Sequence, residues 1–155
     1  MERNKLELVG QERKRNNEII FYALAFVVAA GLRFIKLGEL PLSSNEANLA
    51  MQAFDILKGI NTNVGGQPGY LSLTTLTFSI FSPTGFWARF WPALTGSMVV
   101  FIPILFKEML GKRCSILLAF LLAIDAGLVA VSRTASGNMI TIVCLLAAIG
   151  FLYTK

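Results

Sequence analysis

Long stretches without any charged side chain are the feature that most constrains how this chain folds. With its flanking residues, each stretch approaches the roughly 20 apolar residues that an α-helix needs to cross the hydrocarbon core of a bilayer. Only 15% of the 155 residues are charged and 55% are hydrophobic, whereas about a quarter of a soluble domain is charged. The sequence therefore predicts an all-α, multi-pass membrane protein. The predicted transmembrane helices are about 19–37, 86–106, 114–131 and 139–154.

Two further segments have a helical pattern but are too polar to cross a bilayer. In 43–58, Asn48, Gln52 and Asp55 recur at helical spacing among apolar residues, which is typical of an amphipathic helix at a membrane surface. In 70–82, serines and threonines alternate with apolar residues, and the segment is too short to span comfortably. The sequence thus predicts two interfacial helices in a long outer loop between the first two transmembrane helices.

The basic residues indicate the orientation of the chain. A charged head, 1–18, precedes the membrane domain, 19–155, and the connector FKEMLGKR at 106–113 holds three basic residues. Because cytoplasmic loops are enriched in lysine and arginine, both the head and the connector are predicted to be inside. Two crossings separate them if 70–82 does not span. If 70–82 spans, the connector is placed outside, against this rule.

The N-terminal region also has the form of a secretory signal peptide. The charged head is followed by an apolar run, and Ala29-Ala30-Gly31 has the form of a cleavage site. Apolar residues continue through Phe34, Ile35 and Leu37, however, and the head is long. An uncleaved first helix with a cytoplasmic N-terminus is the preferred interpretation.

Composition excludes several kinds of chemistry. The chain has no histidine, so imidazole acid–base catalysis and histidine metal ligation are excluded, and no metal site is predicted. Cys114 and Cys144 are isolated in or beside apolar runs, which is typical of packed thiols rather than disulfides. The net charge of +5 comes from basic residues that flank apolar runs, so no nucleic-acid partner is predicted.

Polar residues suited to ligand recognition gather in two predicted outer segments. The first contains Asn45 and Glu46, the second is SRTASGN at 132–138, and Arg89 opens the second transmembrane helix. Two loops about 90 residues apart therefore converge on one face of the membrane. Because guanidinium groups bind phosphate oxygens bidentately, this face is predicted to hold a lipid phosphate.

The order of these motifs resembles that of the protein O-mannosyltransferases. These are C-type glycosyltransferases, multi-spanning enzymes that use polyprenyl-phosphate sugars. The resemblance covers residues 20–155, and it includes Asn45-Glu46, where the family has an Asp-Glu pair, followed by the Pro-containing segment GQPGYLSL. The other matching residues, within RFWPALTGSMVVFIPILF and LLAIDAGLVAVSRTASGNMI, are Arg89, Pro92, Ala93, Gly96, Asp125, Ser132 and Arg133.

The resemblance implies transfer of a mannose-like sugar from a polyprenyl phosphate to an acceptor hydroxyl on a protein or glycan. It places the reaction on the extracytoplasmic face and leaves the need for a divalent metal undetermined. By this analogy Glu46 orients the acceptor or assists as base, and Asn45 and Asn138 contribute hydrogen bonds. The residues implied to hold the lipid phosphate are Arg89, Arg133 and Ser132.

Two departures from the family pattern support a rival interpretation. Asn45 stands where the family has its proposed catalytic Asp, and Asn138 stands at a second Asp position. An amide is no useful proton acceptor near neutral pH. Such enzymes also continue for several more spans, so the 155 residues alone are expected to be inactive. The rival is a degenerate or truncated relative that acts as a membrane scaffold or complex subunit. A transporter is a third option, although no inverted repeat is evident.

Several of these residues also have purely structural interpretations. Ser43 and Glu46 have the spacing of a capping box, with Ser43 as N-cap. Asp125 is a charged residue within a predicted span, so a paired or functional role is expected. Arg33 and Lys36 are predicted to anchor the end of the first span by extending to the interface, and the same interpretation applies to the two outer arginines.

Overall fold

The computed structural model describes residues 2–60 and 66–153, and within them every regular element is a helix. The prediction of an all-α protein is therefore confirmed. In chain order the elements are α1 (Glu2–Phe34), α2 (Ser44–Leu57), α3 (Pro68–Ile80), α4 (Gly85–Met98), the 3₁₀ helix η1 (Val99–Phe101), α5 (Ile102–Leu105), α6 (Lys107–Leu110), α7 (Lys112–Ile124), α8 (Ala126–Ser132) and α9 (Asn138–Tyr153).

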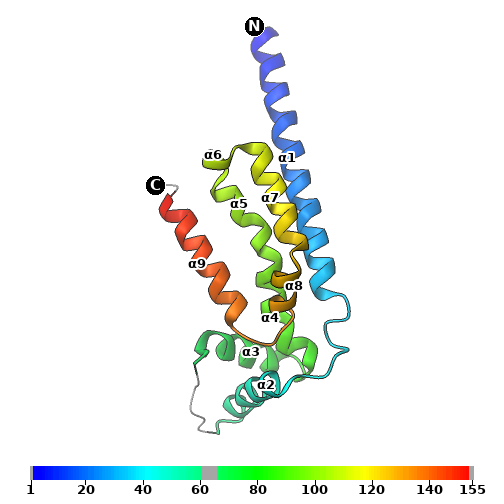
Figure 1. The fold of residues 1–155 in the computed structure, drawn as a ribbon, viewed down its shortest axis with the longest axis vertical. Coiled ribbons are helices and arrows are strands. Elements are labelled where there is room, and N and C mark those ends of the chain that lie inside the picture. The colour runs from blue at the N-terminus through cyan, green and yellow to red at the C-terminus, as the bar shows by residue number, and fades with distance from the viewer. Residues whose placement is uncertain (1, 61–65, 154–155) are drawn as a thin grey trace.

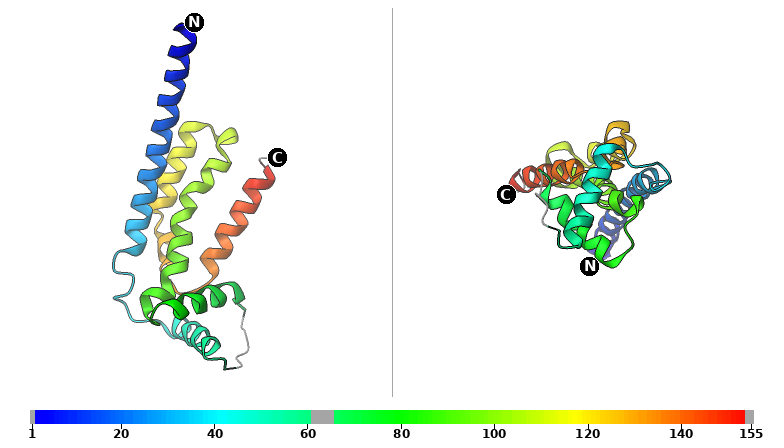
Figure 2. Two further views of the ribbon diagram at one scale, coloured as in Figure 1. Left: turned by 180° about the vertical axis from the view of Figure 1, so that it is seen from behind. Right: turned by 90° about the horizontal axis from the view of Figure 1, so that it is seen from below.

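The helices form an elongated bundle with two short helices across one end. In Figure 1, α1, α4 with α5, α7 with α8, and α9 all extend along the long axis, while α2 and α3 lie crosswise below them. The N-terminal part of α1 extends beyond the bundle at the opposite end, and Figure 2 shows the same arrangement from behind. We call these two ends the α2–α3 end and the head end.

Two helices of the described residues are long and apolar enough to cross a membrane, or three if a bent pair is one span. The two are Asn16–Phe34 and Gly85–Leu105, and the bent pair is α7 with α8, which meet at 54°. The 16 residues of α9 rise only about 24 Å, against a hydrocarbon core of about 30 Å. Apolar character alone predicted four spans. The structure supports at most three because α9 is short, and only two if the bend between α7 and α8 prevents that pair from acting as one span.

The predicted interfacial segments 43–58 and 70–82 form α2 and α3, and neither runs along the bundle. At the head end, Lys107 and Lys112 both pair with Glu18, the latter at 3.0 Å between Nζ and Oε1. The basic connector therefore lies at the same end as residue 18, as two passes between them require. The side of a membrane that each end faces stays a prediction.

Small residues allow the long helices to approach closely. Ala25 and Ala29 of α1 and Ala119 and Ala123 of α7 are fully buried. A Cβ on Gly96 of α4 would come within 2.4 Å of the Ser132 Cβ. Membrane helices commonly use such small residues at their interfaces, because backbones then pack at short range.

The prediction that Arg33 anchors the membrane end of α1 is wrong. Its side chain is fully buried and donates from Nη1 to the carbonyl oxygens of Ala29 at 3.2 Å and Ala123 at 3.1 Å. Nη2 donates to the Leu122 oxygen at 3.3 Å. The last carbonyls of a helix lack partners within it, so Arg33 caps the C-terminus of α7. Lys36, in contrast, is exposed and pairs with Glu39 at 3.4 Å.

Asp125 explains the bend that follows α7. It is the C-cap of α7 and the N-cap of α8, and its Oδ1 accepts a hydrogen bond from the Leu128 N–H at 2.7 Å. An N-cap aspartate satisfies an unpaired N–H of the helix that it starts, so a separate helix, α8, begins here at 54° to α7. Asp125 was predicted to have a paired or functional role within a span. In the structure its role is to cap the N-terminus of α8.

Candidate functional site

The site is built on the N-terminus of α2. Ser43 is the N-cap; its Oγ accepts from the Glu46 N–H at 3.5 Å, and the Ser43 N–H donates to Glu46 Oε2 at 2.8 Å. Both halves of the predicted capping box are present, so that structural interpretation is confirmed. The box turns the Glu46 side chain back toward the start of its helix.

Glu46 also forms a buried ion pair with Arg89 of α4. Arg89 Nε donates to Oε1 at 3.0 Å and Nη2 donates to Oε2 at 2.9 Å, a bidentate geometry. The Ala135 N–H, from the loop after α8, donates to Oε1 at 2.7 Å. One carboxylate therefore ties α2 to α4 and to the α8–α9 loop.

The remaining N–H groups of Arg89 bind the loop between α1 and α2. Nη1 donates to the carbonyl oxygens of Leu37 at 3.1 Å and Leu40 at 2.9 Å, and Nη2 donates to that of Pro41 at 3.1 Å. With the two bonds to Glu46, all five guanidinium N–H groups are used. Arg89 has no donor left for a phosphate in this arrangement, which corrects its predicted role.

The surroundings of Glu46 keep its carboxylate ionised. Burial alone raises the pKa, but hydrogen bonds from Arg89 and from the Ser43 and Ala135 N–H groups, with the Arg89 charge, outweigh it and lower the pKa to about 2. A carboxylate with so low a pKa is a poor proton acceptor near neutral pH. Glu46 thus orders the site, which does not support its predicted action as a base.

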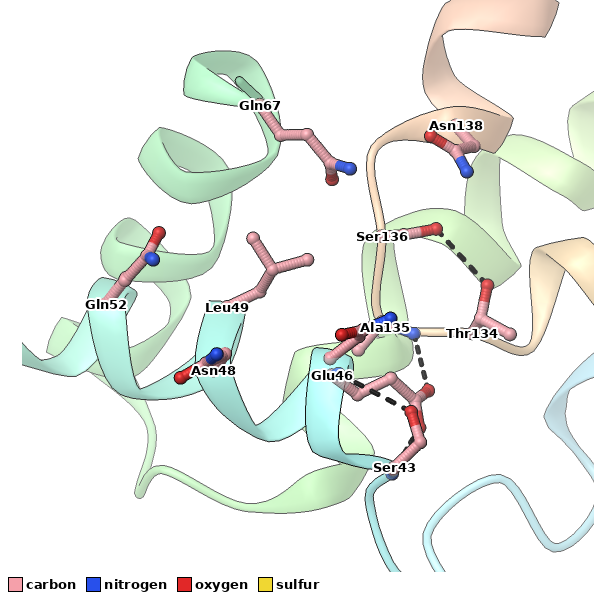
Figure 3. A pocket seen from close by; sticks show the side chains of 11 residues that line it. Ser43, Glu46, Asn48, Leu49, Gln52, Gln67, Thr134, Ala135, Ser136 and Asn138 are labelled. Carbon is pink, nitrogen blue, oxygen red and sulfur yellow. Dashed lines mark hydrogen bonds between the residues drawn. The ribbon is translucent and has the colours of Figure 1, made fainter. Parts of the chain in front are cut away.

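A polar pocket of about 490 Å³ opens beside this ion pair (Figure 3). It lies between α2, the start of α3 and the α8–α9 loop, so the two predicted outer segments do converge. Asn45, Glu46 and Asn138, predicted from sequence to act together, all line it. The full set of lining residues is Ser43, Asn45, Glu46, Asn48, Leu49, Gln52, Gln67, Thr134, Ala135, Ser136 and Asn138.

Sequence reasoning missed the contribution of α3 to this pocket. Gln67, the N-cap residue of α3, accepts a hydrogen bond at Oε1 from the Gly137 N–H at 2.7 Å. Gly137 lies so close to α3 that a Cβ there would be 3.2 Å from the Tyr70 Cβ. Tyr70 fixes α3 by donating to the Ala88 carbonyl oxygen at 2.8 Å, and burial raises its pKa to about 12. The GQPGY motif was visible in the sequence, but its proximity to the second loop was not.

A second cavity, of about 280 Å³, lies on the other side of Glu46. Arg133 lines it, together with Thr134 and Glu46, which line both cavities. Arg133 donates from Nη1 to the Leu32 oxygen and from Nη2 to the Ile35 oxygen, both at 3.0 Å. Two of its five N–H groups are thus used, and the rest have no acceptor among the described residues.

Ser132 does not reach either cavity. It is fully buried against Gly96, and its Oγ donates to the Val129 carbonyl oxygen at 2.9 Å. Its predicted contact with a lipid phosphate is therefore wrong, because the hydroxyl is satisfied within its own helix.

The described residues contain no group of three or more Cys, Asp or Glu side chains that could hold a metal ion. Comparisons with known protein families, with curated proteins and with solved structures gave no match to this chain. What the site does must therefore be argued from its own geometry.

Proposed function

We propose that this chain is the membrane portion of a glycosyltransferase, and that it holds a polyprenyl-phosphate sugar at its α2–α3 end. One observation carries the proposal. A pocket lined by amides and hydroxyls adjoins a cavity in which Arg133 has N–H groups without an acceptor among the described residues. The two compartments have the complementary chemistries of a sugar and of the phosphate attached to it.

The larger pocket suits an uncharged, hydroxyl-rich ligand. Amide side chains both donate and accept hydrogen bonds, as sugar hydroxyls do, and Asn45, Asn48, Gln52, Gln67 and Asn138 supply them. The one ionised group, Glu46, is neutralised by Arg89. A volume of about 490 Å³ is within the usual range of ligand sites, about 300–1,000 Å³.

The smaller cavity suits the phosphate. A guanidinium group with free N–H groups is the preferred partner of a phosphate oxygen. Arg133 is held by the carbonyl oxygens of Leu32, in the last turn of α1, and of Ile35, just after it, so it is already oriented before a ligand arrives. Since Thr134 lines both cavities, a phosphate beside Arg133 leaves an attached sugar close to the larger pocket.

The proposal includes an orientation in the membrane. The N-terminal head and the basic connector face the cytoplasm, and the α2–α3 end faces outward, so that α2 and α3 lie at the outer interface. In this arrangement α9 makes a fourth crossing. Its shortness is accommodated by local thinning of the bilayer or by flanking residues that reach the interface.

A scaffold or complex subunit is the second candidate, and one observation favours it. Both oxygens of Glu46 accept protein hydrogen bonds, four in all. The residues that line the larger pocket include no other carboxylate. A protein of this kind would bind the lipid-linked sugar, or a partner, without turnover.

Replacing Arg133 tests the phosphate site. Arg133→Ala removes charge-assisted hydrogen bonds and should weaken binding of a polyprenyl phosphate, measured in nanodiscs, roughly tenfold or more. Arg133→Lys should rescue binding only in part, because a point charge lacks the guanidinium fork. Arg113→Ala is the matched control, since Arg113 is exposed at the start of α7, far from the site. Equal binding by the Arg133→Ala protein would refute the assignment.

Asn45→Asp separates enzyme from scaffold. It places a carboxylate at the rim of the larger pocket, where the resembled family has one. If the protein is an enzyme with low activity because Asn45 replaces a carboxylate, the intact Asn45→Asp protein should release sugar from a polyprenyl-phosphate mannose donor faster than the unchanged protein does. In a scaffold, donor binding should persist and turnover should stay at background.

A further inference from the structure

The outward face of α7 carries an apolar stripe that ends in a carboxylate. Leu117, Leu121 and Ile124 are each more than 60% exposed, and with Phe120 and Asp125 they line an open groove of about 400 Å³. The three residues recur at spacings of four and three, the pattern of a helix–helix seam. This groove is separate from the two cavities of the proposed site.

Asp125 makes this face unusual for one that meets lipid. It is exposed and lies between α7 and α8, within the bent pair that has the length and composition of a single span. One oxygen accepts from the Leu128 N–H, and among the described residues no cation forms an ion pair with this carboxylate. The charge of Arg33 acts on it, but the Arg33 side chain is fully buried and is not available on the exposed face. Ionisable residues at such depth normally face other protein and pair there.

A second copy of this chain does not suit the groove. Copies in one membrane share their orientation, so a two-fold axis lies along the membrane normal and places both Asp125 residues at the same depth. If the two grooves docked, the two Asp125 carboxylates would face each other and repel strongly in a medium of low dielectric. The occupant must therefore bring the opposite charge.

We propose that the Leu117–Asp125 face of α7 docks a transmembrane helix of a separate membrane protein, one that carries a lysine or arginine at the depth of Asp125. The apolar stripe supplies the packing surface, and the carboxylate supplies register and selectivity. Ala126 and Gly127, both exposed where α8 begins, leave room for the partner helix beside the charge. This inference does not depend on the proposed function.

Cross-linking with a defined probe tests the proposal. The full chain, with Cys114 and Cys144 replaced by Ser and with Leu121→Cys, is placed in vesicles with a Leu/Ala transmembrane peptide. The peptide carries a central lysine and a cysteine one turn away. Disulfide formation should be about tenfold faster with this peptide than with one that has leucine in place of lysine. Leu145→Cys, on an equally exposed face of α9, should show no such preference.

Asp125→Asn isolates the charge from the fold. Asparagine is as good an N-cap as aspartate, so α8 keeps its start while the preference for the lysine peptide should disappear. Retention of that preference in Asp125→Asn would overturn the proposal, as would equal rates in the Leu121→Cys and Leu145→Cys proteins. Two further results with Leu121→Cys would also overturn it: a disulfide-linked homodimer that forms faster than the peptide adduct, and protection of the introduced thiol before any peptide is added.

Discussion

Arg33 and Arg89 are both almost completely buried, 0% and 6% exposed, yet their surroundings differ in kind. Arg89 has a carboxylate partner and uses all five N–H groups. Arg33 binds carbonyl oxygens alone, and its Nε has no partner among the described residues. One guanidinium is fully compensated, and the other is held by the end of a helix.

The difference shows two ways in which buried arginines serve a helical bundle. Arg89 joins separate segments. It donates to carbonyl oxygens of the α1–α2 loop, and its partner Glu46 connects it to α2 and to the α8–α9 loop. Arg33 serves a single break, between α7 and α8, where irregular backbone within a bundle needs internal partners. The first arrangement builds the candidate site, and the second stabilises the bend between α7 and α8.

Loss of Arg89 is expected to have the largest effect on stability. Arg89→Ala leaves Glu46 as a buried unpaired charge, which costs about 3–5 kcal/mol. The free energy of unfolding in detergent can be followed by the emission of Trp87 and Trp91, which flank Arg89 in α4. Adding Glu46→Gln should recover part of the loss, because it removes the orphaned charge. A loss under about 1 kcal/mol would show that the pair contributes little.

The pH dependence of stability sharpens the same point. The pKa of Glu46 is lowered in the folded protein from its ordinary 4.5 to about 2. The stabilisation is therefore fully present above about pH 4.5 and is lost as the pH falls toward 2, by about 3 kcal/mol in total. Denaturation by the same tryptophan signal at several pH values measures it. Glu46→Gln should remove this part of the slope, and an unchanged slope would contradict the assignment.

The sequence predicted the elements of the α2–α3 end well, because their signals are local. The capping box and the polar stripe of 43–58 led to α2 (Ser44–Leu57), and a short polar run led to α3 (Pro68–Ile80). The convergence of Asn45 and Asn138 followed from topology. The pairing of Arg89 with Glu46 was missed. The two residues are 43 positions apart, and nothing in the sequence shows that Arg89 pairs with a carboxylate of the same chain instead of a ligand phosphate.

The bundle itself was predicted less well, because its decisive features are tertiary. The apolar run 114–131 predicts one continuous span, and the break at Asp125 depends on Arg33 from a different helix capping α7. Burial of Arg33 depends in turn on Gly96, whose added Cβ would lie 3.1 Å from the Arg33 Nε. Neither the capping of α7 by Arg33 nor the contact of Arg33 with Gly96 produces a repeating pattern in the sequence, so neither could be predicted from it.

Replacing Arg33 should have a smaller effect than replacing Arg89, and this is the sharpest test of the comparison. Arg33→Met fills a similar space, removes the buried charge and its orphaned Nε, and frees the carbonyls of Leu122 and Ala123. These terms oppose each other, so a loss below about 2 kcal/mol is expected. Asp125→Asn keeps the α8 cap but removes the charge, so it provides the second variant of a double-mutant cycle with Arg33→Met. A loss as large as that of Arg89→Ala, and not additive with Asp125→Asn, would show that Asp125 compensates Arg33 as Glu46 does Arg89.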